Sequence, residues 1–198
     1  GKILANELKY KLFEGLNKFI NDGKLIIGIC NGFQVLVKSG ILPGNDIWRQ
    51  EASLIINDSG KFEDRWVYLS SAGGKSGEPA CKCVWTKGIA EVIYLPVAHG
   101  EGKFVVEDKS VISRIRKNGQ IVLRYCDING KSCGYPDNPN GSVEDIAGIC
   151  DSSGRIFGLM PHPERHVNLS QHPRWSSKKS GDGLKIFENG VNYIKKSF

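Results

Sequence analysis

The chemistry in this sequence starts at Cys30, which stands between two glycines, Gly28 and Gly32. An apolar run from Leu25 to Ile29 predicts a buried strand before the cysteine, and an amphipathic run follows at once. The form G-x-C-x-G is typical of a nucleophile elbow, a sharp strand-to-helix turn that lifts one reactive side chain above a sheet. Glycines are expected on both sides because a Cβ atom would clash where strand and helix approach each other. The alternative is a buried structural cysteine before a glycine-containing turn.

A helix that begins directly after Cys30 would point its positive end at the sulfur, which favours thiolate over thiol. A cysteine nucleophile also needs a base, and the base needs a third group that sets its tautomer. Both occur far downstream in Pro-His162-Pro-Glu164, after the apolar run from Ile156 to Met160. The two prolines predict a stiff, non-helical tip at a strand end. Residues two apart point the same way in such a tip, so His162 and Glu164 are expected to project together.

The rest of the chain must bring Cys30 and His162 together, and a parallel sheet does this at its carboxyl edge. Apolar periodicity predicts one helix from Ile3 to Ile20, a second after the elbow, and a closing helix over 184–194. Loops are expected over 70–77 and 129–142, and a tight turn over 151–154. Further strands are predicted over 53–57, 65–70, 89–96, 103–106, 121–127 and 146–150.

Other polar residues leave two interpretations open. His99 lies at a predicted strand end and is followed by Gly100 and Gly102, so it is either a structural histidine or part of a site. Gln34 lies one helix turn beyond Cys30, where its amide either faces the site or is exposed. His166 and His172 belong to a polar, irregular segment and are expected at the surface.

The composition fits one ordinary globular domain, with 198 residues, 40% hydrophobic and 24% charged. No apolar run approaches the ~20 residues of a membrane span, and Gly1-Lys2 does not begin a signal peptide. The net charge of +6 raises nucleic acid as a partner, but the lysines are scattered and no aromatic-basic motif accompanies them. The excess charge is expected to form a solvated face, or one that meets a protein partner or an anionic nucleotide.

The six cysteines are expected to be free thiols in a reducing cytoplasm, because no secretory signal accompanies them. Cys81-Lys-Cys83 comes nearest to a metal motif, but C-x-C without a second pair at suitable spacing does not define a zinc site. We therefore expect no metal in this chain.

Two motifs together resemble those of the class I (triad-type) glutamine amidotransferases: Gly-Ile-Cys30-Asn-Gly-Phe-Gln34 and Met-Pro-His162-Pro-Glu164-Arg165. More narrowly, the chain resembles the glutaminase subunit or domain of phosphoribosylformylglycinamidine synthase. The similarity extends along essentially the whole chain. It also includes the stretches 65–69, 96–102 and 138–142, the last leading into Asp145-Ile-Ala-Gly.

The resemblance implies an α/β fold, with a mostly parallel central sheet flanked by helices, as in flavodoxin-like proteins. It implies that residues 1–198 form one amidotransferase domain without the family's N-terminal strand-helix units. Cys30 would be the nucleophile, His162 the base and Glu164 its orienting carboxylate. Asn31, Gln34, His99 and Gly100 would bind the substrate.

The resemblance also implies the reaction, in which glutamine is hydrolysed to glutamate and ammonia through a cysteine thioester. The ammonia would pass to a synthetase that amidates formylglycinamide ribonucleotide, with ATP and magnesium expected on that partner and a small accessory subunit as a further candidate partner. This chain has no G-x-x-x-x-G-K-[ST] motif and no cofactor is expected in it. A cytoplasmic location is expected.

One oxyanion donor would be the backbone N–H of Asn31, and the second would come from the family's upstream glycine-rich loop. Because losing one such donor costs about 3–4 kcal/mol, the isolated chain is expected to be weakly active. Two alternatives stay open. One is a catalytically silent, partner-binding domain, and the other is a different cysteine hydrolase with the same elbow, such as a peptidase.

Overall fold

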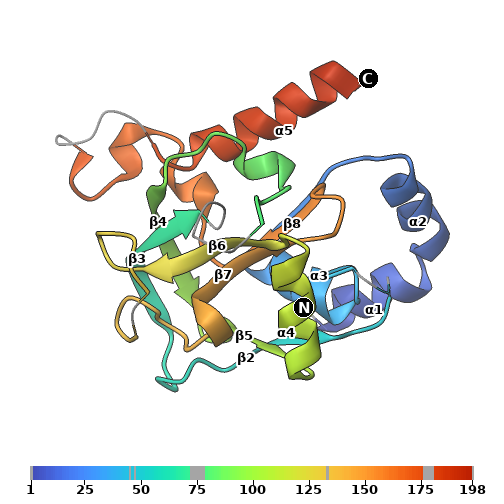
Figure 1. Ribbon diagram of the computed structural model, residues 1–198, viewed down its shortest axis with the longest axis horizontal. Helices are drawn as coiled ribbons and strands as arrows, with labels where there is room; N and C mark the ends of the chain where they lie inside the picture. The colour runs from blue at the N-terminus through green and yellow to red at the C-terminus, as the bar shows by residue number, and fades with distance from the viewer. Residues whose placement is uncertain are drawn as a thin grey trace.

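A computed structural model describes residues 2–44, 46, 48–71, 79–132, 134–175 and 181–197 of the chain. Within this part the central sheet has six strands, in the order β1-β8-β7-β6-β3-β4 (Figure 1). In that order the strands are β1 (Ile26–Ile29), β8 (Ile156–Leu159), β7 (Ile146–Cys150), β6 (Ile121–Cys126), β3 (Glu63–Ser71) and β4 (Val92–His99).

The pairing of these strands confirms the α/β class but corrects the expected mostly parallel sheet. Of the described pairs in this sheet only β1 and β8 run parallel, and the others are antiparallel. The turn Asp151–Gly154 shows why, since a connection this short can join only antiparallel neighbours such as β7 and β8. The single parallel pair is nevertheless the one that matters, because Cys30 follows β1 and His162 follows β8 at the same edge.

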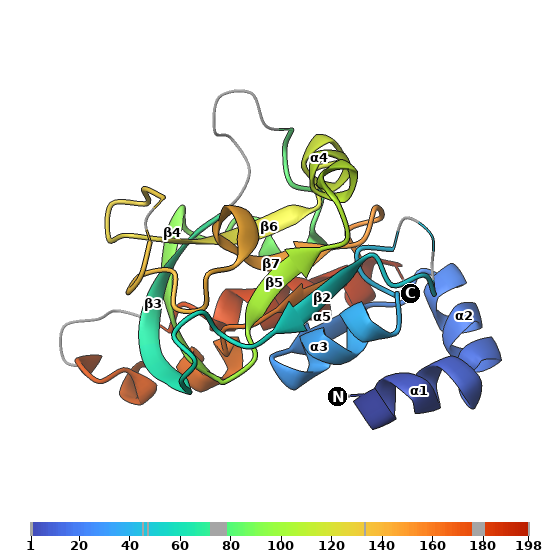
Figure 2. The ribbon, with the colours of Figure 1, turned by 90° about the horizontal axis from the view of Figure 1, so that it is seen from below.

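Both faces of the central sheet are covered. On one face α3 (Asn31–Lys38) contacts β1 and β8, and it also contacts the antiparallel pair of β2 (Ala52–Ile55) and β5 (Lys103–Val106). Figure 2 shows α3 alongside β2, with α1 (Lys2–Tyr10) and α2 (Phe13–Asn21) beyond it. On the other face Ile186 of α5 (Leu184–Ser197) packs into the core formed by β3, β4 and β6.

Consecutive residues of a strand point alternately into the core on the α3 side and the core on the α5 side of the sheet. Ile149 and Ile156 belong to the core on the α3 side, while Cys150 and Phe157 belong to the core on the α5 side. This alternation is what a sheet buried on both faces requires.

Two helical predictions need correction. The apolar stripe from Ile3 to Ile20 forms two helices, since α1 ends where the backbone N–H groups of Lys11 and Leu12 both donate to the carbonyl of Glu7. The helix α4 (Lys109–Lys117) has no counterpart among the predicted elements. Asp108 caps it, because its carboxylate accepts hydrogen bonds from two backbone N–H groups of the first turn.

Of the predicted loop over 70–77, residues 72–77 lie outside the described residues, and so does Cys133. Among the helices that the structure describes, none has the length and apolar character needed to cross a membrane.

Candidate active site

Cys30 occupies a strained turn between β1 and α3. Its φ of 51° and ψ of −103° lie where residues with a side chain rarely fall, and such strain persists only where neighbours hold it. Here the Cys30 N–H donates to the Leu159 carbonyl at 2.8 Å, and the Cys30 carbonyl accepts from the Gln34 N–H at 3.1 Å. The cysteine is therefore held from β8 and from the first turn of α3.

The glycines around the elbow have different roles. A Cβ atom at Gly28 would lie 2.5 Å from Leu36 Cδ1 and 2.8 Å from the Gly32 backbone, so the close approach of strand and helix requires glycine there. At Gly32 a Cβ would meet nothing within 4 Å, and the predicted clash at this position is wrong. A third glycine was not predicted. Gly158 of β8 leaves room for Phe33 of α3, and a Cβ on it would come within 2.7 Å of that ring.

His162 follows β8 after Met160 and Pro161, and its N–H donates to the Pro96 carbonyl at 2.8 Å. Its Nδ1 atom lies 2.6 Å from Oε1 of Glu164. The expected non-helical tip is wrong, because residues 163–166 form the 3-10 turn η3 (Pro163–His166) with His162 at its N-cap. Among the described residues the buried Nε2 atom has no hydrogen-bond partner, and the Cys30 thiol, which lines the same cleft, donates to the Ala98 carbonyl at 3.8 Å.

His162 and Glu164 stabilise each other's charged forms. Burial alone lowers the pKa of His162, but the interactions with Cys30 and Glu164 outweigh it and raise that pKa to about 9. Burial alone raises the pKa of Glu164, but the hydrogen bond from His162 outweighs it, and the pKa lies below its usual value. At neutral pH the pair is therefore an imidazolium and a carboxylate.

The cysteine and the histidine open into one cleft of about 520 Å³. Every predicted site residue except Glu164 lines it, and Glu164 stands behind His162. Sequence reasoning missed several lining residues, among which Glu101 and Arg165 bear charges. The complete lining is Ile29, Cys30, Asn31, Gln34, Phe62, Ala98, His99, Gly100, Glu101, His162 and Arg165.

Gln34 is fixed by the loop that follows β4. Its Nε2 donates to the Glu101 carbonyl at 2.8 Å, so it ties α3 to this loop across the cleft. Gly102 permits the loop to pass close to His99, since a Cβ there would lie 2.5 Å from the Nδ1 of that histidine. Gln34 therefore positions the cleft wall as well as lining it.

His99 is buried and held by two asparagines that sequence reasoning missed. The amide nitrogen of Asn57 donates to the carbonyls of Lys61 and His99, at 2.9 and 2.8 Å. Its Oδ1 therefore accepts, from His99 Nδ1 at 3.1 Å and from the Gly102 N–H at 2.9 Å. The ring proton lies on Nδ1, and Nε2 accepts from Asn140 at 3.5 Å. Burial lowers the pKa of His99 to about 4, so the ring stays neutral.

The expected surface positions of His166 and His172 are wrong, because both are buried. Their rings pack against Trp66 of β3, with centroids 5.0 and 4.9 Å away. The His166 Nδ1 atom lies 2.8 Å from the Tyr94 carbonyl, and the Tyr94 N–H donates to Asp182 at 2.9 Å.

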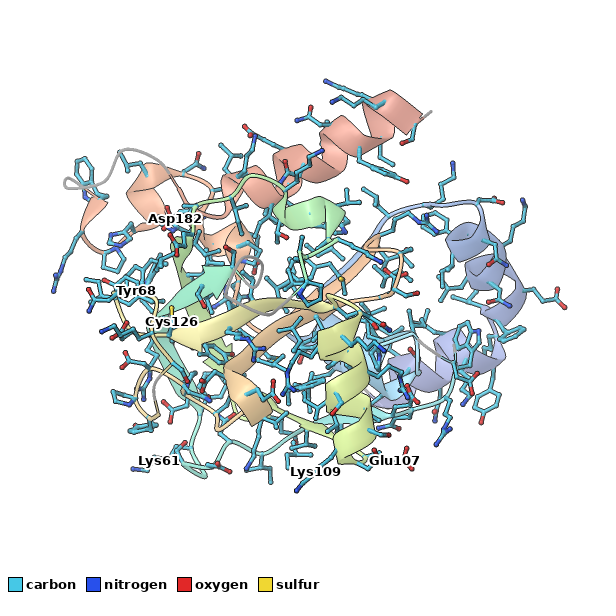
Figure 3. The ribbon with its side chains drawn as sticks, in the orientation of Figure 1. Lys61, Tyr68, Glu107, Lys109, Cys126 and Asp182 are labelled. Carbon is cyan, nitrogen blue, oxygen red and sulfur yellow. The ribbon has the colours of Figure 1, made fainter. Side chains whose placement is uncertain are left out.

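Figure 3 shows Asp182 on the same side of the molecule as Tyr68 and Cys126, which pair between β3 and β6. These contacts hold the chain that follows η3 against the sheet.

Within the described part of the chain, no group of three or more His, Cys, Asp or Glu side chains is arranged to hold a metal ion. The cleft instead combines a cysteine at a helix N-terminus with a histidine–carboxylate pair. This fold and arrangement are those of cysteine-dependent acyl-transfer enzymes of the elbow type.

Comparisons with known proteins narrow this class. Residues 1–194 match the family model of the CobB/CobQ-like glutamine amidotransferase domain. Phosphoribosylformylglycinamidine synthase subunit PurQ from Dehalococcoides mccartyi is 52% identical, over 98% of this chain and 73% of its own length. The subunit of the same name from Methanococcus maripaludis is 44% identical, over 99% of this chain and 75% of its own length. Among solved structures, PurLQS from Thermotoga maritima matches with a TM-score of 0.68 and 33% identity, over 96% of this chain and 71% of that one.

The chain therefore belongs to the glutamine amidotransferase family and, within it, to the PurQ subunits of phosphoribosylformylglycinamidine synthase.

Proposed function

We propose that this chain hydrolyses glutamine to glutamate and ammonia, and that the ammonia serves the conversion of formylglycinamide ribonucleotide to formylglycinamidine ribonucleotide in purine biosynthesis. One observation carries the chemistry: Cys30, on a strained elbow, and His162, held by Glu164, open into the same cleft. Membership in the PurQ subunits supports glutamine as the amide that enters this cleft.

In the first half of the reaction the Cys30 sulfur attacks the side-chain carboxamide carbon of glutamine. The carbonyl oxygen becomes an oxyanion, and the N–H of Asn31, at the start of α3, is one donor for it, because the first N–H groups of a helix have no intrahelical acceptor. Imidazolium on His162 then gives a proton to the amide nitrogen, and ammonia leaves. The product on the enzyme is a γ-glutamyl thioester of Cys30.

In the second half the neutral His162 accepts a proton from water, which attacks the thioester. Glutamate leaves and Cys30 returns to its starting state. Glu164 keeps the proton of Nδ1 in place through both halves, so that Nε2 is the atom that exchanges protons with substrate.

Recognition of glutamine needs a cation for its carboxylate and an anion for its ammonium group. Arg165 and Glu101 line the cleft and supply one charge of each sign. We assign the α-carboxylate to Arg165 and the α-ammonium group to Glu101. Gln34, His99 and Gly100 shape the wall between them. Reversing either charge is expected to raise KM for glutamine while leaving the alkylation of Cys30 by iodoacetamide unchanged.

The partner proposed for this chain is the synthetase subunit, together with a small accessory subunit. Its likeness to PurLQS from Thermotoga maritima supports this assignment. ATP and magnesium would be bound by the synthetase, and a cytoplasmic location belongs to the same proposal.

The test measures ammonia release from glutamine by the complex with the synthetase, for the native chain and for Cys30→Ala. The substitution is expected to abolish release, and a diazo-ketone analogue of glutamine is expected to label Cys30 alone. Cys126→Ala is the matched control, because it removes a thiol of β6 that does not line the cleft. Release that persists in Cys30→Ala would overturn the proposal.

A further inference from the structure

A second cleft, with a volume of about 810 Å³, lies between α5 and the segment over 80–89. Figure 1 shows this segment, in green, beneath α5. In the described part of the chain the second cleft shares no lining residue with the candidate active site, so Cys30 and His162 do not belong to it. Sites for small ligands have volumes of about 300–1,000 Å³, and this cleft falls within that range.

The charged residues of the second cleft are all positive. Lys82, Lys87 and Lys196 line it, and no carboxylate is among its described lining residues. All three lysines are exposed, and none of them forms an ion pair within the described part of the chain. By contrast, Lys185 near the start of α5 pairs with Glu188 at 3.5 Å. The cleft therefore presents three positive charges that no described carboxylate neutralises, and such a concentration attracts anions.

One face of α5 forms a wall of the second cleft. Its lining residues are spaced three, one and three positions apart, which places them on the same side of the helix; they are Asn189, Asn192, Tyr193 and Lys196. The carbonyl end of α5 lies beside Lys196 and carries about half a negative charge. The three lysines outweigh this partial charge, so the cleft as a whole remains positive.

A tight turn holds Lys87 at the opposite wall. The N–H of Ile89 donates to the Thr86 carbonyl at 3.3 Å. Between them Lys87 has a φ of −61° and a ψ of 117°, and Gly88 has a φ of 70°, which match a type II turn. The amide of Asn189 donates to the Lys87 carbonyl at 2.9 Å, so α5 fixes the orientation of this turn.

The segment before this turn is anchored on two sides. On the hairpin of β7 and β8, the N–H of Val84 donates to the Gly154 carbonyl at 2.9 Å, and the indole N–H of Trp85 donates to the Arg155 carbonyl at 2.9 Å. On the other side α5 comes so close that a Cβ on Gly190 would lie 2.6 Å from the ring of Trp85. Both walls of the cleft are therefore fixed before a ligand arrives, and little conformational entropy is lost in ordering them on binding.

We propose that the second cleft is a binding site for a diphosphate group, free as pyrophosphate or carried by a nucleotide such as ADP, and that Lys82, Lys87 and Lys196 bind it. A terminal phosphate alone carries about −1.5 to −2 charges at pH 7, and the second phosphate adds to this, so a diphosphate matches three lysines. A single carboxylate would leave most of the positive charge without a partner. Lysine binds phosphate as a point charge on a flexible stem, which suits a ligand that is held from two walls.

Apolar side chains distinguish the two sources of this diphosphate. Val84, Ile89 and Tyr193 also line the cleft and are half-buried, so a nucleoside can pack against them and pyrophosphate cannot. Tighter binding of ADP than of pyrophosphate would identify a nucleotide as the ligand, and equal binding would identify the free diphosphate. Inorganic phosphate bears fewer charges and should bind more weakly than either.

The first experiment titrates the full chain with pyrophosphate, ADP and inorganic phosphate by calorimetry at low ionic strength, where exposed charges are least screened. Lys82→Gln, Lys87→Gln and Lys196→Gln are each expected to weaken pyrophosphate binding by about fivefold, the upper range for an exposed ion pair. Lys195→Gln is the matched control, because it removes the same charge from the neighbouring position of α5, which does not line the cleft. Since all four lysines are exposed, the variants should fold like the native chain, which urea unfolding checks.

Three results of the titration would overturn the proposal. One is that neither diphosphate binds the native chain. Another is that Lys195→Gln weakens binding as much as Lys87→Gln, which would show a diffuse attraction to a basic surface. The third is that alkylation of Cys30 abolishes binding, which would place the ligand in the active-site cleft. Because Cys30 lies outside the second cleft, the diphosphate site and glutamine hydrolysis can fail independently.

The second experiment locates the ligand in the native chain without any substitution. Exposed lysines are acetylated with and without pyrophosphate, and the modified positions are identified by mass spectrometry after cleavage with chymotrypsin. Pyrophosphate is expected to slow the acetylation of Lys82, Lys87 and Lys196 several-fold and to leave that of Lys195 unchanged. Equal protection of all four lysines, or protection of none, would contradict a diphosphate site in this cleft.

Discussion

The Nδ1 atom of His162 lies 2.6 Å from Oε1 of Glu164, although the two residues belong to a 3-10 turn and not to an extended strand. His162 is the N-cap of this turn, with a φ of −106° and a ψ of 86°, and Glu164 belongs to the turn itself. Because Nδ1 donates to the carboxylate, Nε2 is left to exchange a proton with the thiol of Cys30.

Glu164→Gln keeps a hydrogen-bond acceptor for Nδ1 and removes the charge. The pKa of His162, raised to about 9 in the native chain, is therefore expected to fall. Since the imidazolium protonates the leaving ammonia, activity is lost as pH rises through this pKa. The alkaline limb of kcat/KM should move to lower pH by about one unit, with a decrease of about fivefold at pH 9 that approaches about tenfold at pH 10.

The measurement is kcat/KM for glutamine between pH 6 and 10. Glu188→Gln is the control, because Glu188 is a glutamate of α5 that pairs with Lys185 away from the cleft. An alkaline limb that stays in place in Glu164→Gln would mean that the carboxylate does not set the charge of His162.

The elbow glycines predict opposite effects of the same substitution. Gly28→Ala places a methyl group 2.5 Å from Leu36 and 2.8 Å from the Gly32 backbone, and is expected to cost about 1–3 kcal/mol or more in the free energy of unfolding. Gly32→Ala meets nothing within 4 Å and adds a better helix former, so it should be neutral or stabilising by up to about 1 kcal/mol. Urea unfolding of both variants checks this. Equal destabilisation would mean that the close approach at Gly28 does not limit the elbow.

The contrast between Gly28 and Gly32 also shows which features of the elbow could be predicted from the sequence and which could not. The motif G-x-C-x-G predicts the elbow, and both strand ends that carry Cys30 and His162 were expected where they lie. Which glycine is needed depends on side chains from another element, such as Leu36 against Gly28, and spacing alone does not contain that contact.

Long-range pairing explains the other errors. Apolar alternation is the same for parallel and antiparallel strands, so it could not predict that only β1 and β8 run parallel among the described pairs of the central sheet. His166 and His172 lie in a polar segment that folds back onto Trp66, a residue of a distant strand. Asn57 is one asparagine in a polar stretch, and its role arises from contacts with the His99 loop more than 40 positions away.

His99 predicts a pH dependence of stability. Its pKa of about 4 in the folded chain lies below the ~6.5 of an unfolded histidine, so the unfolded state binds the proton more tightly. The neutral His99 therefore contributes to the free energy of unfolding above pH ~6.5. This contribution, up to about 3 kcal/mol in total, is lost as pH falls through about 4. His99→Gln should show a shallower fall in unfolding free energy between pH 6.5 and 4, measured by urea unfolding. Equal slopes in the two proteins would contradict a neutral, buried His99.

Asn57 predicts a link between a buried hydrogen-bond network and substrate affinity. Asn57→Ala leaves the Nδ1–H of His99 and the N–H of Gly102 without their acceptor, at about 1–3 kcal/mol for each buried group. The loop over 100–102 forms one wall of the cleft, so KM for glutamine should rise by about tenfold, with a smaller change in kcat.

Asn189→Ala is the matched control for this prediction. Asn189 also donates two hydrogen bonds to carbonyls, those of Trp85 and Lys87, but it lies on α5 away from the active-site cleft. Both variants should lose stability, and only Asn57→Ala should raise KM. If both raise KM by the same factor, the effect comes from general loosening of the fold. If neither does, the wall formed by residues 100–102 does not depend on Asn57. Either result would contradict the prediction that the hydrogen bonds of Asn57 to the His99 loop support glutamine binding.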